Sequence, residues 1–278
     1  MAAARHEVAV PASWAQGRTV YGGLSAALLC DAVSQGVDPT RRLRYLKVGF
    51  LRPLEVEIPF RIEMEELRAG RTVVVRSGHI IQGDVACVAM QANFVTALES
   101  RVAIDTFRPP ALAARDAEGA MRMSGPGFPA FTRYIDFHAT TKGLPFQGGD
   151  VPELGGWMRF NTAPDTFMQS HLVGLTDAWP PAPVTYYDRM VPLSSVNWGI
   201  HFAEPLSGIR GDDYLGYLAR INFFRDGYGS STADIWALPD AMSAWYARWR
   251  QRLERDSLSV AERVSQMETA NPVFIPRN

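Results

Sequence analysis

The chain has 278 residues, of which 47% are hydrophobic and 21% are charged. This composition is typical of a globular protein with a buried core, and the length suits one large domain or two of ordinary size. The formal net charge of −1 excludes a general electrostatic surface for nucleic acid or an anionic membrane, so we expect neither nucleic acid nor membrane insertion among its interactions.

The first half of the chain predicts one helix followed by four strands. Apolar residues lie almost all round the segment 22–36, which favours a buried helix, and Gly36 suits the left-handed position after its end. Four strand-like segments follow, each closed by a proline or a turn signal: 46–51, 56–67, 71–82 and 85–95. The glycine at the junction of the last two predicts a hairpin. One apolar helix with four antiparallel strands is an α+β unit.

The second half repeats this order after a linker. Prolines punctuate residues 98–130 without a sustained period, which predicts the linker, with at most a short helix near 111–121. Pro164 predicts the start of a second helix that ends before Pro180. Strands are expected at 134–140, 156–160, 195–202, 213–224, 229–237 and 243–251. A helix followed by four strands, found twice, predicts an internal duplication with domains at 1–97 and 131–252 and a tail at 253–278.

Several classes of site are absent from the sequence. Cys30 and Cys87 lie apart among small apolar residues, so we expect both to be reduced core residues. No clustered Cys/His spacing, GxSxG pattern or Walker-type loop occurs, so neither a metal site nor an α/β-hydrolase or P-loop site is expected. The first residues lack an apolar signal region, and no apolar run reaches about 18 residues, which predicts a soluble, cytoplasmic protein.

Four short patterns stand in a familiar order in the first half. They are Tyr-Gly-Gly at 21–23, Phe-Leu-Arg-Pro at 50–53, Arg-Ala-Gly-Arg at 68–71 and Gln-Gly at 82–83. In this set the chain resembles the TesB-like acyl-CoA thioesterases. A looser similarity continues through Trp-Met-Arg at 157–159, Asp-Ala-Trp-Pro-Pro at 177–181 and Asp-Gly-Tyr at 226–228. The resemblance implies a double hotdog, two tandem α+β domains whose antiparallel sheets each wrap a long helix.

The same resemblance implies an activity and a site. Family members hydrolyse fatty acyl-CoA without a metal or covalent cofactor, using an Asp, a Thr or Ser, and a Gln of the second hotdog to position a water. These positions fall here on Asn197, Asn222 and Gln251, of which only Gln251 keeps the family's residue type. Helix-start amides at Gly22 and Gly23 are expected to bind the thioester oxygen.

The departures from the family pattern leave alternatives open. An Asn cannot accept a proton as a general base at neutral pH, so Asp177 or Asp234 is a possible substitute carboxylate. The helix-start glycines equally fit a plain loop-to-helix turn. The protein could also bind acyl-CoA without cleaving it, act as a hotdog lyase, which would need an Asp–His pair, or serve as an interaction module. Unpaired sheet edges favour a homodimer or a larger homo-oligomer.

Overall fold

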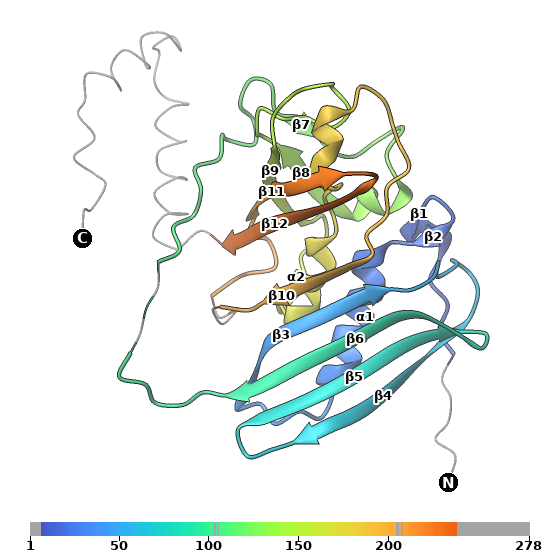
Figure 1. Ribbon diagram of the computed structural model, residues 1–278, viewed down its shortest axis with the longest axis vertical. Coiled ribbons are helices and arrows are strands. Elements are labelled where there is room, and N and C mark those ends of the chain that lie inside the picture. The colour runs from blue at the N-terminus through green and yellow to red at the C-terminus, as the bar shows by residue number, and fades with distance from the viewer. Residues whose placement is uncertain (1–6, 103, 105, 204–205, 207, 238–278) are drawn as a thin grey trace. The chain divides into compact units, whose positions relative to one another are not determined.

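The computed structural model describes residues 7–102, 104, 106–203, 206 and 208–237, all within one compact unit. In this part of the chain, two α-helices and two five-stranded antiparallel sheets form the framework (Figure 1), which confirms the α+β class. Shorter elements are β1 (Ala15–Gln16), β2 (Thr19–Val20), η1 (Ala12–Trp14), η2 (Ala130–Tyr134) and η3 (Ala182–Tyr186).

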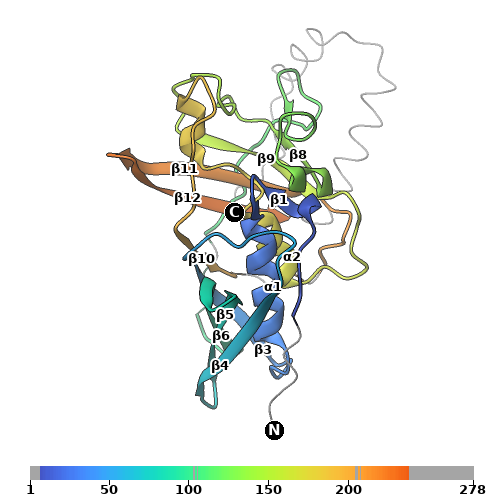
Figure 2. The same ribbon diagram turned by 90° about the vertical axis from the view of Figure 1, so that its right-hand side faces the viewer.

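The first sheet has the strand order β10-β3-β6-β5-β4. Its strands are β3 (Arg41–Phe50), β4 (Phe60–Ala69), β5 (Val73–Gln82), β6 (Val85–Thr96) and β10 (Asn197–His201). The helix α1 (Gly22–Ser34) runs along this sheet (Figure 2). A glycine on β5 gives the helix room, because a Cβ added to Gly78 would lie 2.8 Å from Leu29 and 2.9 Å from Val33.

The second sheet has the strand order β12-β11-β9-β8-β7. Its strands are β7 (Met121–Arg122), β8 (Ile135–Ala139), β9 (Glu153–Phe160), β11 (Leu215–Arg225) and β12 (Tyr228–Ala237), and the accompanying helix is α2 (Gln169–Thr176). Phe137, Met158 and Leu215 are fully buried in its core. After α2, Trp179 stacks on Tyr217 with ring centroids 5.1 Å apart, which fixes the helix end against the sheet.

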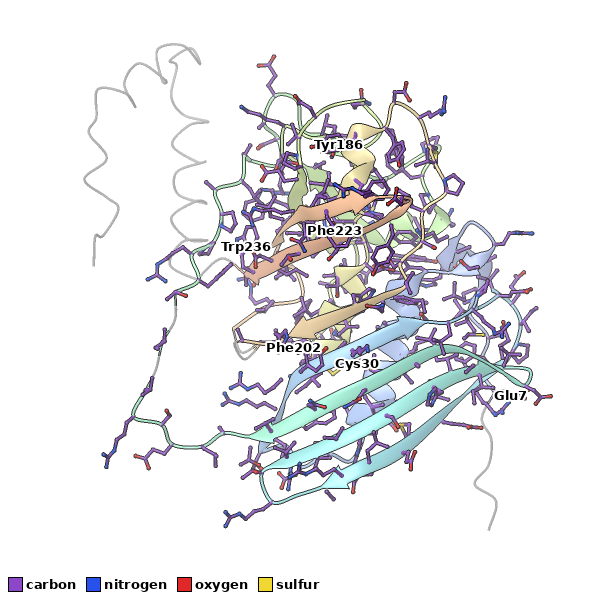
Figure 3. The ribbon with its side chains drawn as sticks, viewed as in Figure 1. Glu7, Cys30, Tyr186, Phe202, Phe223 and Trp236 are labelled. Atoms are coloured by element: carbon purple, nitrogen blue, oxygen red, sulfur yellow. The ribbon has the colours of Figure 1, made fainter. Side chains whose placement is uncertain are left out.

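The strand β10 joins the two halves, because it follows α2 in the chain but pairs with β3 of the first half. The antiparallel register places Asn197 opposite Gly49. Beyond the strand, Arg44 donates a hydrogen bond to the carbonyl oxygen of Phe202 at 3.1 Å, across 158 residues of sequence. Phe202 is buried in the first core (Figure 3). The two predicted domains thus share one sheet.

The second helix and the linker differ from the prediction, and one predicted strand is not tested. The helix α2 begins at Gln169 and not at Pro164, because residues 161–168 form a loop and the first turn is set by a bond from the Met168 N–H to the His171 ring. The predicted linker contains β7, and turns replace the short helix expected near 111–121. The strand predicted at 243–251 lies outside the described residues.

The two helices cross with their backbones in contact at a pair of glycines. A Cβ added to Gly23 would lie 2.4 Å from the carbonyl oxygen of Gly174 and 2.4 Å from the ring of Tyr21. The Tyr21 hydroxyl donates a hydrogen bond to the same carbonyl at 2.5 Å, and its ring stacks on Phe131 at 3.9 Å. Because carbonyl and ring fill the space that a side chain would need, the crossing requires glycine at residue 23.

We expect Gly23→Ala to lower the free energy of unfolding by about 2 to 3 kcal/mol, because the added methyl group would force the helices apart. Chemical denaturation measures this change. Gly49→Ala is the matched control, since a Cβ there would lie 3.6 Å from Leu51, an ordinary contact, and should change stability by less than about 0.5 kcal/mol. Equal losses in the two variants would contradict the packing argument.

Candidate functional site

The start of α1 meets a carboxylate from the end of α2. Asp177 is the residue directly after α2. A Cβ added to Gly22 would lie 2.5 Å from the Asp177 Oδ2 and 3.1 Å from the ring of Phe50. The absence of a side chain at residue 22 therefore lets the carboxyl group reach the first turn of α1. Gly22 allows the close approach of Asp177, and Gly23 allows that of the α2 backbone. Both roles are independent of any contact with a ligand.

The environment of Asp177 sets its protonation. Surrounding protein raises the pKa of its carboxyl group to about 7, and the nearby Gly23 N–H lowers the pKa in part. The residue keeps some accessible surface. Amides at the start of a helix favour a negative charge, so the position can hold the carboxylate as well as the acid. A carboxyl group that titrates near neutral pH is suited to act as a general base.

Two phenols border this carboxyl group, Tyr21 on the α1 side and Tyr217 on β11. Burial is the main cause that raises the pKa of each hydroxyl, and the charge of Asp177 adds to the effect. Both phenols therefore remain neutral at physiological pH. Since the Tyr21 hydroxyl is bonded to the Gly174 carbonyl, its role is to hold the helix crossing beside Asp177.

The start of α2 repeats this arrangement with an aspartate from α1. Its first turn is held by the His171 Nδ1, which accepts a hydrogen bond from the Met168 N–H at 3.0 Å. Burial lowers the pKa of His171, and Asp31 of α1 is near enough to oppose that shift by its charge. Each helix start thus lies near an aspartate of the other helix, as a duplicated unit would place them.

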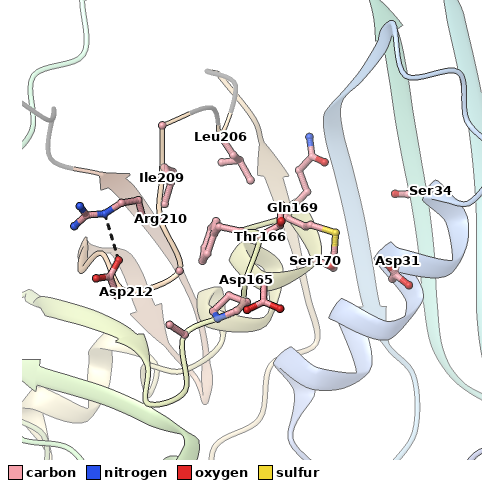
Figure 4. A pocket seen from close by; sticks show the side chains of 16 residues that line it. Asp31, Ser34, Asp165, Thr166, Gln169, Ser170, Leu206, Ile209, Arg210 and Asp212 are labelled. Carbon is pink, nitrogen blue, oxygen red and sulfur yellow. Dashed lines mark ion pairs between the residues drawn. The ribbon is translucent and has the colours of Figure 1, made fainter.

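A cavity of about 800 Å³ opens at the start of α2. Asp31 and Ser34 of α1 lie on one side of it, and Gln169 and Ser170 of α2 on the other (Figure 4). The loops 163–168 and 208–212 and Leu206 complete its lining with mixed apolar and polar side chains. The His171 and Leu172 N–H groups donate to the Met168 carbonyl oxygen. Only the first amides of the helix, at Gln169 and Ser170, can therefore face a ligand in this cavity.

The structure places the predicted residues Asn197 and Asn222 on different sheets. Asn197 is exposed at the start of β10 and lies opposite Gly49, whereas the adjacent Trp198 packs against the first core, so the two side chains leave opposite faces of the sheet. Asn222 is exposed on β11 and is bonded to Thr232 at 3.0 Å. Gln251 lies outside the described residues.

The other residues singled out from the sequence show no further site. Asp234 pairs with Arg220 at 3.3 Å, away from either helix start. Cys30 and Cys87 are buried and free, as expected, and burial raises the pKa of Cys30 to about 12, which suppresses the thiolate. Among the described residues, no group of side chains has the arrangement of a metal site. None of the helices in the described ranges is long and apolar enough to cross a bilayer.

Two family models match most of the chain. The acyl-CoA thioesterase N-terminal domain matches residues 10–95, and the acyl-CoA thioesterase C-terminal domain matches residues 108–256. The chain belongs to the acyl-CoA thioesterase family. This membership agrees with the resemblance seen in the sequence patterns of the first half.

Solved structures show the double hotdog fold of this thioesterase-family chain. A conserved hot dog protein of unknown function from Alicyclobacillus acidocaldarius is 21% identical with a TM-score of 0.72, over 83% of this chain and 86% of the other. The acyl-CoA thioesterase II TesB2 of Mycobacterium marinum is 20% identical with a TM-score of 0.59, over 79% and 83% of the two chains.

A short match connects the thioesterase-family chain to a different protein. The protein nucleotidyltransferase YdiU of Rhizobium johnstonii is 52% identical over 40 residues, which is 14% of this chain and 8% of that protein. The same protein from Rhizobium etli is 55% identical over 40 residues, again 8% of its length. The chain thus spans less than a tenth of these curated relatives, and their activity does not carry over.

Asp177→Asn should change how stability depends on pH. The folded pKa of about 7 lies above the usual value of about 3.9 for an unfolded Asp. Its contribution to stability is therefore complete below about pH 4 and is lost as pH rises through about 7. Between pH 5 and 8, the free energy of unfolding of the wild type should fall relative to the variant by about 2 kcal/mol, allowing for partial solvent access. Parallel profiles in urea denaturation would contradict the assignment.

Proposed function

We propose that the protein hydrolyses acyl-CoA thioesters at the start of α1. The observation that carries this proposal is the Asp177 carboxyl group, whose pKa is raised to about 7 and which lies against the first turn of the helix. Membership of the acyl-CoA thioesterase family supports the reaction class. The sequence positions of Asn197 and Asn222 offer no base, and Asp177 supplies one from a different element.

The reaction needs a base and donors for the developing oxyanion. The Asp177 carboxylate accepts a proton from water as the oxygen of that water bonds to the thioester carbonyl carbon. The amides of Leu24 and Ser25 already donate to the Tyr21 carbonyl, and the Gly23 N–H lies near Asp177. The Gly22 N–H is thus the donor for the oxyanion. Collapse of the intermediate breaks the carbon–sulfur bond, and the CoA sulfur takes up the proton, giving free acid and CoA.

Apolar side chains beside this helix start provide a wall for the acyl group. Phe50 contacts the Gly22 position, and its ring lies 5.7 Å from that of Trp198. Both side chains pack against the first core from partly exposed positions. Such a surface holds a hydrocarbon chain by removing it from water, at about 25 cal/mol per Å² of buried apolar area. The acyl chain therefore extends along β3 and β10.

Asp177→Asn should lower kcat for acyl-CoA hydrolysis about 10²- to 10⁴-fold, the usual contribution of a general base. A panel of short, medium and long acyl-CoAs with detection of free thiol measures turnover. Asp84→Asn, which removes the same charge from an exposed turn, is the matched control and should keep wild-type turnover. Gln251→Ala, assayed beside it, shows whether that amide contributes. A wild-type rate retained in Asp177→Asn would refute the proposed base.

The pH profile of the wild type gives a second test of the same base. Because the carboxylate is the active form, kcat/KM should rise with pH and level off above about 7, following the pKa of Asp177. The profile is measured with one acyl-CoA at subsaturating concentration. A rate that is flat from pH 5 to 8 would rule out this residue.

A second candidate function is binding of acyl-CoA without cleavage. It is favoured by the amides Asn197 and Asn222, which stand where the family resemblance implies an Asp and a Thr or Ser, and by their placement on different sheets. The acyl-CoA panel separates the two functions. No thiol release at any chain length, together with measurable CoA binding by calorimetry, would identify a binding protein.

A further inference from the structure

We propose that the outer face of the second sheet carries a binding site for a phosphate group, formed by Arg115, Arg122 and Arg159. Arg122 and Arg159 flank one carboxylate, Asp136 of β8. Arg115 lies over the ring of Tyr214, whose hydroxyl is bonded to that carboxylate. The three arginines lie on different elements: Arg122 on β7, Arg159 on β9, and Arg115 in a turn of the segment that joins the two halves. This site is separate from the start of α1, and the chemistry it selects is a tetrahedral oxyanion.

The carboxylate of Asp136 organises the cluster. Its oxygens accept hydrogen bonds from the Tyr214 hydroxyl and from the His138 Nε2, the latter at 2.9 Å. The Nε atoms of Arg159 and Arg122 lie 3.6 and 3.9 Å from it. The hydrogen bonds from Tyr214 and His138 and the charges of His138 and Arg122 outweigh burial and lower the pKa of Asp136. The group therefore stays ionised and anchors the arginines.

The ring of Tyr214 positions two of the guanidinium groups. The Arg115 Cζ lies 3.9 Å from the ring centroid and the Arg159 Cζ lies 4.3 Å from it. A guanidinium placed over an aromatic ring keeps its N–H edge free for other acceptors. This contact reduces the entropy that each arginine would lose on binding an anion.

The cluster has more donors than acceptors. Two guanidinium groups lie beside one carboxylate and a third lies over the ring of Tyr214, and the Arg159 Nε is enclosed without a hydrogen-bond partner in the described residues. Within the described ranges, neither Arg115 nor Arg122 donates a hydrogen bond. Arginine N–H groups match the oxygens of a phosphate in a bidentate geometry. A phosphate would supply acceptors for the N–H groups of Arg115 and Arg122 and neutralise the excess charge.

The phosphate site adjoins the rim of the cavity at α2. The Arg159 Nη1 donates a hydrogen bond to the Asp212 carbonyl oxygen at 3.1 Å, and Asp212 lines that cavity. The side chain of Asp212 pairs with Arg210 at 3.3 Å, and the same arginine also pairs with Asp213 at 2.9 Å. A phosphate at the cluster can therefore belong to free phosphate or to the nucleotide end of a longer ligand such as CoA.

Binding of inorganic phosphate tests the site directly. The full chain is titrated by calorimetry, and the double variant Arg115→Gln/Arg122→Gln should weaken binding at least about fivefold, the upper range for an exposed ion pair. Both side chains make few contacts, and the ion pair of Arg159 remains. Arg220→Gln is the control, because Arg220 lies on the same sheet in a partly exposed pair with Asp234. No phosphate binding by the wild type, or equal weakening in the control, would overturn the site.

A second comparison identifies the source of the phosphate, and only this part rests on the proposed hydrolysis. Acyl-CoA and the matching acyl-pantetheine, which lacks phosphate, are assayed with the double variant. A KM raised at least about fivefold for acyl-CoA alone, with kcat unchanged, would assign the site to CoA. Equal KM values for both substrates, with phosphate binding lost, would assign it to free phosphate. Absence of turnover with either substrate would refute the proposed hydrolysis and leave the calorimetry to decide the site.

Discussion

The contact between α1 and α2 is the constraint on which the site depends. Gly23 lets the backbone of α1 meet that of α2 at Gly174, where a side chain on residue 23 would separate the helices, whereas a Cβ on Gly174 would make only ordinary contacts. Because the helices are this close, Asp177 at the end of one reaches the first turn of the other. The same contact carries the bond from the Tyr21 hydroxyl to the Gly174 carbonyl. The glycine at residue 23 therefore determines that the Asp177 carboxyl group lies against the first turn of α1.

The placement of Asp177 has a cost in stability that the rest of the fold offsets. The described residues provide no ion pair to its carboxyl group, and burial disfavours the charge. The position at the end of its own helix also opposes a negative charge, whereas the start of α1 favours it. The two hydrophobic cores, one including Leu29 and the other Met158, supply the burial that keeps the group in place. A titratable group whose pKa is shifted by its surroundings is typical of functional sites.

Much of the fold could be predicted from sequence, because the signals were local. The segment 22–36 is apolar on all sides, and the structure has α1 at Gly22–Ser34. The hairpin at Gly83 is found between β5 and β6, where that residue has a φ of 60°. The predicted start of α2 at Pro164 was wrong. Proline is a common first helical residue, but a bond from the Met168 N–H to the His171 ring sets a later start, and this bond forms only in the folded loop.

The site was less predictable, because its parts are distant in sequence and belong to different elements. Asp177 was one of two substitute carboxylates in the sequence, and nothing local distinguished it from Asp234. The structure distinguishes the two, because Asp177 lies at the start of α1 whereas Asp234 pairs with Arg220. The partners of Asp136 were equally hidden: Tyr214 lies 78 residues from it in the chain.

The position of β10 in the first sheet has a consequence for synthesis of the chain. The edge of β3 is covered by residues that leave the ribosome about 150 residues later, as the bond between Arg44 and Phe202 shows. During translation the first half therefore emerges with an uncovered strand edge, which is a template for pairing with other chains. Closure of so large a loop also slows folding, since its entropy is lost before the contact forms. Because the two halves share one sheet, the first half completes its sheet only after β10 of the second half has been synthesised.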